Sequence, residues 1–258
     1  MTGAPISWGV CEANGWGYQI EADRVLTEMR ECGITATELG PDGYLPQDAK
    51  ELARVLDGHG LDLCGAFVPI VLHKKDRLKA SYERARRQAE VLAALNAGNF
   101  VLATPAEDGD YDSRDPMDAQ AKAVFSESLP MITEIAKEFG LQMVLHPHAG
   151  TMFETPNDLD FLLNETDINL CLDTVHIVVG GGNPLDIAKR AGSRVKHVHL
   201  KDCDAAAAAR IQNRTSTYST EVKNGMYKPL GQGDAQISEV IRFLDGINYE
   251  GKLVLEQD

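Results

Sequence analysis

Four ionisable side chains stand at equivalent places in the sequence, each at the carboxyl end of a short apolar run. They are His146 in LQMVLH, Asp173 in INLCLD, His199 in VKHVH and Glu256 in KLVLE. If the runs are parallel strands of one barrel, their carboxyl ends meet on one face, where enzymes of that fold build their sites. Two imidazoles and two carboxylates suit a divalent transition metal. The pattern therefore predicts a metal site from these residues, which follow one another at intervals of 27, 26 and 57 positions.

Further histidines and a lysine accompany these strand ends. His148 follows in HPH and His176 follows in DTVH, so in each pair one side chain would bind the metal and the other would orient a substrate or move a proton. His197 and His199 share one side of a strand by its two-residue period. We expect His197 to lie a layer deeper in the core. Lys201 is expected at the mouth of the site, with a solvated loop position as the alternative.

Polar and aromatic residues near two earlier strand candidates are candidates for substrate binding. Glu38 ends TATE, and Trp8, Glu12 and Trp16 cluster around the end of the first apolar run. The chain has two tryptophans, and both fall at the predicted open face, where a sugar-like ring packs well on an indole. The alternative is that the tryptophans fill the top of the barrel.

Short β-type runs alternate with longer helical patterns along the chain, which predicts a parallel α/β fold. The strand candidates are Pro5–Val10, Thr35–Leu39, Leu61–Val68, Asn99–Thr104, Gln142–Leu145, Ile168–Leu172, Arg194–Leu200 and Leu253–Leu255. The helical patterns are Ala22–Cys32, Gln47–His59, Lys75–Ala97, Pro116–Phe139, Pro156–Glu165, Pro184–Ala191 and Ser238–Leu244, with Ala205–Ala209 in a short extra helix. Eight strands in 258 residues predict a (β/α)8 TIM barrel that forms one domain, 1–258, and ends just after its eighth strand.

The alternative fold, an open doubly wound sheet, calls for a GxGxxG loop after its first strand. The loop Asn14–Gly17 (NGWG) lacks that fingerprint, and Val178–Pro184 (VVGGGNP) lacks the GK[ST] ending of a P-loop. We therefore expect no organic cofactor and no redox chemistry.

The composition limits the kinds of molecule that the protein could bind. The net charge is 25 − 39 = −14, which disfavours nucleic acids and anionic membranes because both attract basic surfaces. The sequence has no basic leader and no apolar run of about 20 residues, the length that spans a bilayer. The five cysteines are scattered, as in a reduced cytoplasmic protein. We expect a cytoplasmic protein with a small-molecule substrate, and homo-oligomer formation stays open.

Seven motifs together resemble a known superfamily, the sugar phosphate isomerase/epimerase TIM barrels. Within it they are most similar to the inosose dehydratase branch, over essentially the whole chain and in the expected order. The motifs are ISWGVCE, TATELGPDGYLP, LHPHAGT, CLDTVH, HVHLKD, PLGQGD and VLEQD. The third, fourth, fifth and seventh contain the four strand-end residues described above.

The resemblance implies a set of metal ligands. The superfamily binds its metal through Glu, Asp, His and Glu at the fifth to eighth strands. The corresponding residues are His146, Asp173, His199 and Glu256. Mn²⁺ or Co²⁺ is the metal that the resemblance favours, and Zn²⁺ and Mg²⁺ suit similar ligands. Val175 departs from the more usual DTGH and would crowd the turn beside Asp173.

The resemblance also implies an activity in inositol catabolism: a metal-dependent lyase that removes water from 2-keto-myo-inositol, or a similar polyhydroxylated ketone, through an enediolate. His148, His176 and Glu256 are the catalytic candidates, and the sequence does not decide which is base and which is acid. A keto-sugar isomerase or epimerase, or a lyase that cleaves C-glycosides, would use the same enediolate. The superfamily also resembles a nuclease with three metals, but the acidic charge argues against that activity.

Overall fold

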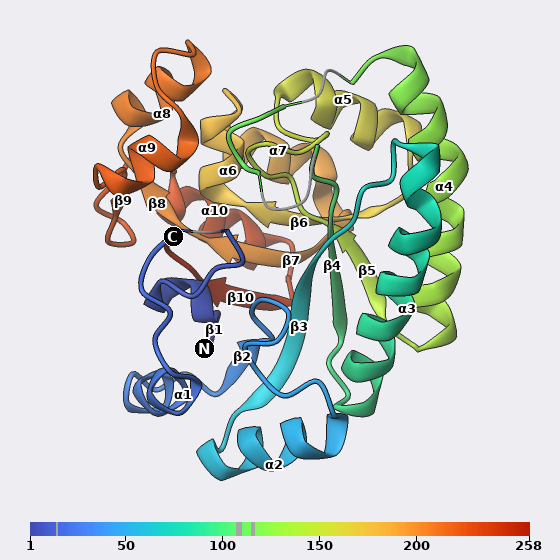
Figure 1. Ribbon diagram of the computed structural model, residues 1–258. Helices are drawn as coiled ribbons and strands as arrows, with labels where there is room; N and C mark the ends of the chain where they lie inside the picture. Colours follow the sequence, from blue (N-terminus) through green and yellow to red (C-terminus); the bar gives the residue numbers. More distant parts are fainter. Residues whose placement is uncertain (14, 107–109, 115–116) are drawn as a thin grey trace. The chain divides into compact units, whose positions relative to one another are not determined.

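The computed structural model describes residues 1–13, 15–106, 110–114 and 117–258 (Figure 1). Its contacts divide the chain into two compact units, Met1–Thr104 with Pro116–Met143 and Pro105–Asp115 with Val144–Asp258. In the described part of the chain, none of the helices combines the length and the apolar character needed to cross a membrane.

The first unit pairs its parallel strands in the order β1, β2, β3, β4. The strands are β1 (Thr2–Gly3), β2 (Ala36–Glu38), β3 (Asp62–Pro69) and β4 (Asn99–Ala103). The helices are η1 (Pro5–Trp8), α1 (Ala22–Glu31), α2 (Ala49–His59), η2 (Lys75–Arg77), α3 (Leu78–Ala94) and α4 (Ala119–Glu138). The alternation of strand and helix is the one that the sequence predicts.

The second unit pairs its parallel strands in the order β5, β6, β7, β10. The strands are β5 (Gln142–Leu145, which begins in the first unit), β6 (Asn169–Asp173), β7 (Val195–Leu200) and β10 (Lys252–Leu255). The helices are α5 (Pro156–Glu165), α6 (Thr174–Val179), α7 (Pro184–Ala191), η3 (Gly192–Arg194), α8 (Ala205–Gln212), α9 (Tyr218–Lys223) and α10 (Ile237–Gly246).

An antiparallel hairpin of short strands, β8 (Asp202–Cys203) and β9 (Tyr227–Lys228), encloses α8 and α9 in the sequence. The Asp202 carboxylate holds the loop that follows, because it accepts hydrogen bonds from the backbone amides of Gly231, Gly233 and Ala235 and from that of Cys203. The aspartate of HVHLKD thus fixes the path of the PLGQGD motif.

One strand prediction is wrong. Pro5–Val10 does not form a strand; it contains the 3₁₀ helix η1, and the first strand is Thr2–Gly3. Proline suits the first helical turn because its missing N–H would have no partner there. Gly9 then ends η1 with a φ of 77°, in the left-handed region that favours glycine. The start of the predicted helical pattern Pro116–Phe139 lies outside the described residues.

The predicted starts of two other helices, at Pro156 and Pro184, are confirmed. α5 and α7 begin at Pro156 and Pro184, and each has a capping side chain immediately before it, Thr155 and Asn183. The alanine run forms α8, with Asp204 as its cap. The sequence patterns did not predict α6 or α9.

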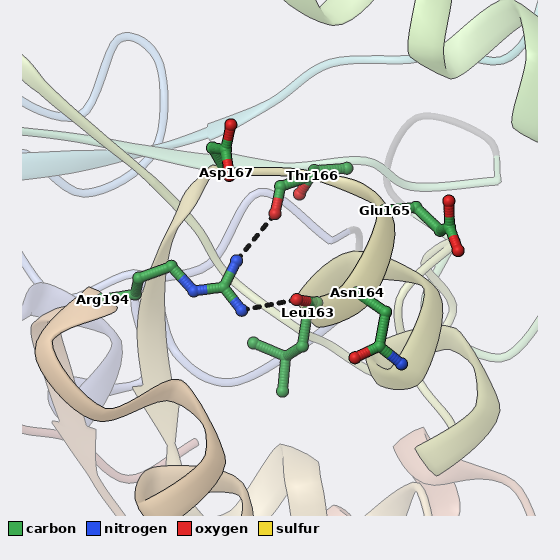
Figure 2. Close-up of a pocket in the computed structure, with 6 residues that line it drawn as sticks. All are labelled: Leu163, Asn164, Glu165, Thr166, Asp167 and Arg194. Carbon is green, nitrogen blue, oxygen red and sulfur yellow. Dashed lines mark hydrogen bonds between the residues drawn. The ribbon is translucent and has the colours of Figure 1, made fainter.

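A pocket of about 290 Å³ lies at the end of α5 in the second unit (Figure 2). Its lining consists of Leu163, Asn164, Glu165, Thr166, Asp167 and Arg194. The Arg194 guanidinium donates to the backbone carbonyls of Leu163 and Thr166, both at 2.7 Å. Those carbonyls would otherwise lack partners at the helix end, so the arginine has a structural task here. The residues that line the pocket come just before the amino ends of β6 and β7. Asp173 and His199 lie toward the carboxyl ends of the same strands.

Candidate active site

The four strand-end residues come together in the second unit. His146 Nε2 lies 3.3 Å from Asp173 Oδ2, and His199 Nδ1 lies 3.7 Å from the same oxygen. His199 Nδ1 is also 3.0 Å from Glu256 Oε2. The four residues are at most 6% exposed. Residues up to 110 positions apart in the sequence (256 − 146) therefore form one buried polar cluster.

Strand register and helix capping position these side chains. Asp173 pairs with His199 across β6 and β7, and His199 pairs with Val254 of β10, two residues before Glu256. Asp173 also begins α6, where its Oδ1 accepts a hydrogen bond from the backbone amide of His176 at 2.8 Å. One oxygen of Asp173 thus caps a helix, and the other faces the histidines.

A buried lysine stands beside this cluster. Lys201 Nζ lies 2.6 Å from Asp258 Oδ1, 2.9 Å from Glu256 Oε2 and 3.6 Å from Asp173 Oδ2, and Lys201 is 3% exposed. Burial lowers the pKa of Lys201, but Asp258, Glu256 and Asp173 outweigh burial and raise its pKa well above the usual value. Lys201 is therefore an ammonium at every ordinary pH.

The charges at this point fit a bound metal. The ammonium of Lys201 and the three carboxylates it contacts sum to 1 − 3 = −2. Burying a net charge of this size is costly without a counter-charge, and burial raises the pKa of Asp173. The donor atoms of Asp173, His199 and Glu256 lie within 4.8 Å of one another, and those of His146 and Asp173 fall in another such group. The nitrogen and oxygen donors and the charge both suit one divalent cation.

The second histidines form a stacked pair. The ring centroids of His148 and His176 lie 3.7 Å apart, and both residues are buried. Burial lowers the pKa of His148 to about 3, with the charges of His146 and Lys201 adding to the effect. Burial also lowers the pKa of His176 well below its usual value. Both imidazoles are therefore neutral near pH 7.

Two tyrosines and an aspartate extend the site beyond the residues predicted from the sequence. Tyr218 Oη donates to Asp258 Oδ2 at 2.5 Å, and Tyr227 Oη donates to the same oxygen at 3.1 Å. The ring of Tyr218 also contacts that of His176, with 5.5 Å between centroids. A two-residue period from Glu256 would have indicated Asp258, but no sequence signal marks the tyrosines, which belong to α9 and β9.

His197 is fully buried, and its ring centroid lies 5.2 Å from that of His199. In β7 it lies two positions before His199, farther from the carboxyl end of the strand, as expected for a deeper residue. Val175, the departure from DTGH, is also fully buried, in the first turn of α6.

The remaining candidates for substrate binding belong to the first unit. The Trp8 indole donates to Glu28 Oε2 of α1 at 2.8 Å, so its polar edge is already engaged. Trp16 and Glu38 are buried, and Glu12 is exposed. Their roles with a substrate stay predictions.

Comparison with known proteins assigns the family. Residues 26–258 match the xylose isomerase-like TIM barrel model, and the chain belongs to that family. The predicted (β/α)8 TIM barrel is therefore confirmed. Among the relatives, the inosose dehydratase of Geobacillus kaustophilus is 28% identical over 266 residues, covering 99% of this chain and 86% of the relative. The chain is accordingly an enzyme whose relatives include inosose dehydratases, as its motifs predict.

Other similarities agree with this assignment. The rhizopine catabolism protein MocC of Rhizobium meliloti is 27% identical over 262 residues, covering 98% of this chain and 80% of the relative. The structure of a probable 3-DHS dehydratase, AsbF, from Bacillus anthracis superposes with a TM-score of 0.74 at 16% identity, covering 99% of this chain and 92% of that one. The IOLI protein with a bound zinc atom gives a TM-score of 0.71 at 14% identity, covering 99% and 87%. At these identities the two structures support the fold alone.

Proposed function

We propose that this enzyme is a metal-dependent hydro-lyase that dehydrates 2-keto-myo-inositol or a similar polyhydroxylated ketone. The observation that carries the proposal is the convergence of His146, Asp173, His199 and Glu256 at a point where the buried side-chain charge is −2. The similarity to inosose dehydratases supports the choice of substrate.

The residues around this point have distinct parts in the proposed reaction. The four converging residues would hold the cation, which when bound supplies Lewis acidity toward the ketone. A neutral imidazole, His148 or His176, takes the proton from the carbon beside the ketone. The electron pair left behind forms an enediolate, the β-hydroxyl departs with a proton as water, and the product relaxes to a diketone.

The lysine has a different part from the histidines. Because its pKa is raised well above the usual value, Lys201 cannot serve as the base near neutral pH. It instead presents a fixed positive charge to the substrate oxygens, which become more negative as the enediolate forms. Glu256 contacts both Lys201 and His199 and is a further candidate for proton transfer.

Mn²⁺ or Co²⁺ is the proposed metal, and Zn²⁺ and Mg²⁺ are the alternatives. The histidine and carboxylate donors suit the transition metals better than Mg²⁺, which prefers oxygen ligands. We also propose that the enzyme works in the cytoplasm without an organic cofactor. The cysteines support a reducing compartment, since they are scattered along the sequence and three of the five are buried.

A keto-sugar isomerase or epimerase is the second candidate, and a C-glycoside-cleaving lyase would share the same first step. Structures of a D-tagatose 3-epimerase-like protein and of an L-ribulose 3-epimerase superpose with TM-scores of 0.68 and 0.70. Proton removal beside a ketone begins all these reactions, so the cluster of donors alone does not separate them.

The deciding experiment incubates metal-loaded enzyme with 2-keto-myo-inositol in D₂O and follows the substrate by NMR and the diketone by absorbance. Diketone formation is expected. Deuterium uptake beside the ketone without loss of water would instead establish the isomerase or epimerase. An Asp173→Asn variant treated in the same way is the control, and product formed equally by both proteins would contradict the proposed site.

A further inference from the structure

Lys201 Nζ contacts two groups of potential ligands. The first group contains Asp173 and Glu256, at 3.6 and 2.9 Å. The second group contains Asp258 Oδ1 at 2.6 Å and His176 Nε2 at 3.4 Å. The ammonium therefore has four neighbours of the types that also bind metal cations.

The second group of ligands resembles a metal site in its own right. One donor atom from each of His148, His176 and Asp258 lies within 4.8 Å of the others. Two imidazoles and a carboxylate are ligand types that suit a divalent transition metal. Yet Asp258 and His176 are also the partners of Lys201, so a metal here would face an ammonium a few ångströms away. Like charges at such short range repel each other, and the repulsion is twice as strong for a divalent ion as for a monovalent one.

We propose that Lys201 is the second cation of a two-cation active site. Its ammonium supplies the positive charge that a metal bound by His148, His176 and Asp258 would otherwise provide, and it thereby limits the enzyme to one metal ion. This inference rests on the proposed metal site at His146, Asp173, His199 and Glu256.

The tyrosines keep this built-in cation in place. Tyr218 and Tyr227 both donate to Asp258 Oδ2, which leaves Oδ1 for Lys201. Asp258 is thus a positioning residue, and its carboxylate keeps a low pKa because Lys201 outweighs the effect of burial. A ketone with a neighbouring hydroxyl offers two adjacent oxygens, one for the metal and one for the ammonium. The arrangement therefore favours α-hydroxyketones over simple ketones as substrates.

The test counts metal ions per chain. Wild-type protein, Lys201→Met and Lys201→Arg are each dialysed against Co²⁺, and bound cobalt is measured by elemental analysis and by its visible absorption. One ion is expected for wild type and for Lys201→Arg, which keeps the charge. Two ions are expected for Lys201→Met, and adding Asp258→Asn to that variant should return the count to one. Lys223→Met, which removes an exposed lysine, should bind one ion.

The outcomes separate this inference from the proposed function. One ion in both wild type and Lys201→Met would overturn the inference and leave the first metal site intact. Two ions in wild type would also overturn it. Failure of wild type to bind any ion would remove the proposed metal site, and the inference with it. If Lys201→Met does not fold, Lys201→Gln takes its place, since it also lacks the charge and keeps a polar end.

Discussion

Replacing Asp202 by asparagine should destabilise the enzyme through two specific hydrogen bonds. Oδ1 of Asp202 accepts from the amides of Cys203 and Ala235, at 3.0 and 2.9 Å. Oδ2 accepts from the amides of Gly231 and Gly233, at 2.8 and 2.9 Å. Asparagine keeps the shape but has one acceptor oxygen, so whichever way it is oriented two amides lose their partner and meet an NH₂ group. At about 1–3 kcal/mol for each unsatisfied donor, the loss should be about 3 kcal/mol.

Urea unfolding of the metal-free protein, in the presence of a chelator, measures this loss without a contribution from metal binding. Asp234→Asn is the matched control, because the Asp234 carboxylate accepts one exposed hydrogen bond, from the backbone amide of Ala205. We expect the control to cost less than about 1 kcal/mol. A free energy of unfolding for Asp202→Asn within about 0.5 kcal/mol of wild type would refute the argument that this carboxylate organises the loop.

Three further predictions concern the site and its support. Asp173→Asn should lower the affinity for Co²⁺ at least tenfold in equilibrium dialysis, since it removes a ligand charge at constant volume; unchanged binding would make Asp173 only a helix cap. Gly180→Ala should lower the free energy of urea unfolding by about 3 kcal/mol, because the new Cβ would lie 1.7 Å from the Glu154 carbonyl oxygen. Gly58→Ala, in open space on a helix, should raise the same free energy by up to about 1 kcal/mol. Equal effects of the two substitutions would be inconsistent with this packing. Burial lowers the pKa of His148 to about 3, so its stabilising contribution is complete above pH 6.5 and the free energy of unfolding falls by up to about 1.4 kcal/mol per pH unit as the pH drops toward 3. His148→Gln should flatten the dependence of the free energy of unfolding on pH in the metal-free protein. Identical slopes for wild type and variant would contradict the lowered pKa of His148.

Short-range rules were sufficient to predict the four strand ends that come together in the buried polar cluster. Each apolar run that ends in His, Asp or Glu belongs to β5, β6, β7 or β10, and parallel pairing brings the ends together. The bounds of α5 and α7 also follow from local chemistry, since a capping residue and a proline begin each helix. These features depend on neighbours in the sequence, which is why the sequence reveals them.

Features that depend on distant contacts were not predictable in the same way. Tyr218 and Tyr227 reach Asp258 because the chain between β8 and β10 follows a path fixed by the Asp202 carboxylate and the amides of a later loop. The prediction of the first strand was wrong for a local reason. The run from Pro5 is apolar enough for a strand, but proline and a left-handed glycine favour a helical turn. Hydrophobicity alone does not distinguish these two outcomes.

The helix cap at Asp173 has a consequence for how the site could adapt during turnover. Carboxylate ligands can swing between one-oxygen and two-oxygen coordination, but Asp173 would have to release the His176 amide and fray the start of α6 to do so. Glu256 follows β10 and does not begin a helix, so its carboxylate is not restrained in that way. Any carboxylate shift at the proposed metal centre should therefore fall to Glu256, while Asp173 would be the rigid ligand. The amide of His176, buried and bonded to Asp173, would report on that rigidity through its rate of hydrogen–deuterium exchange.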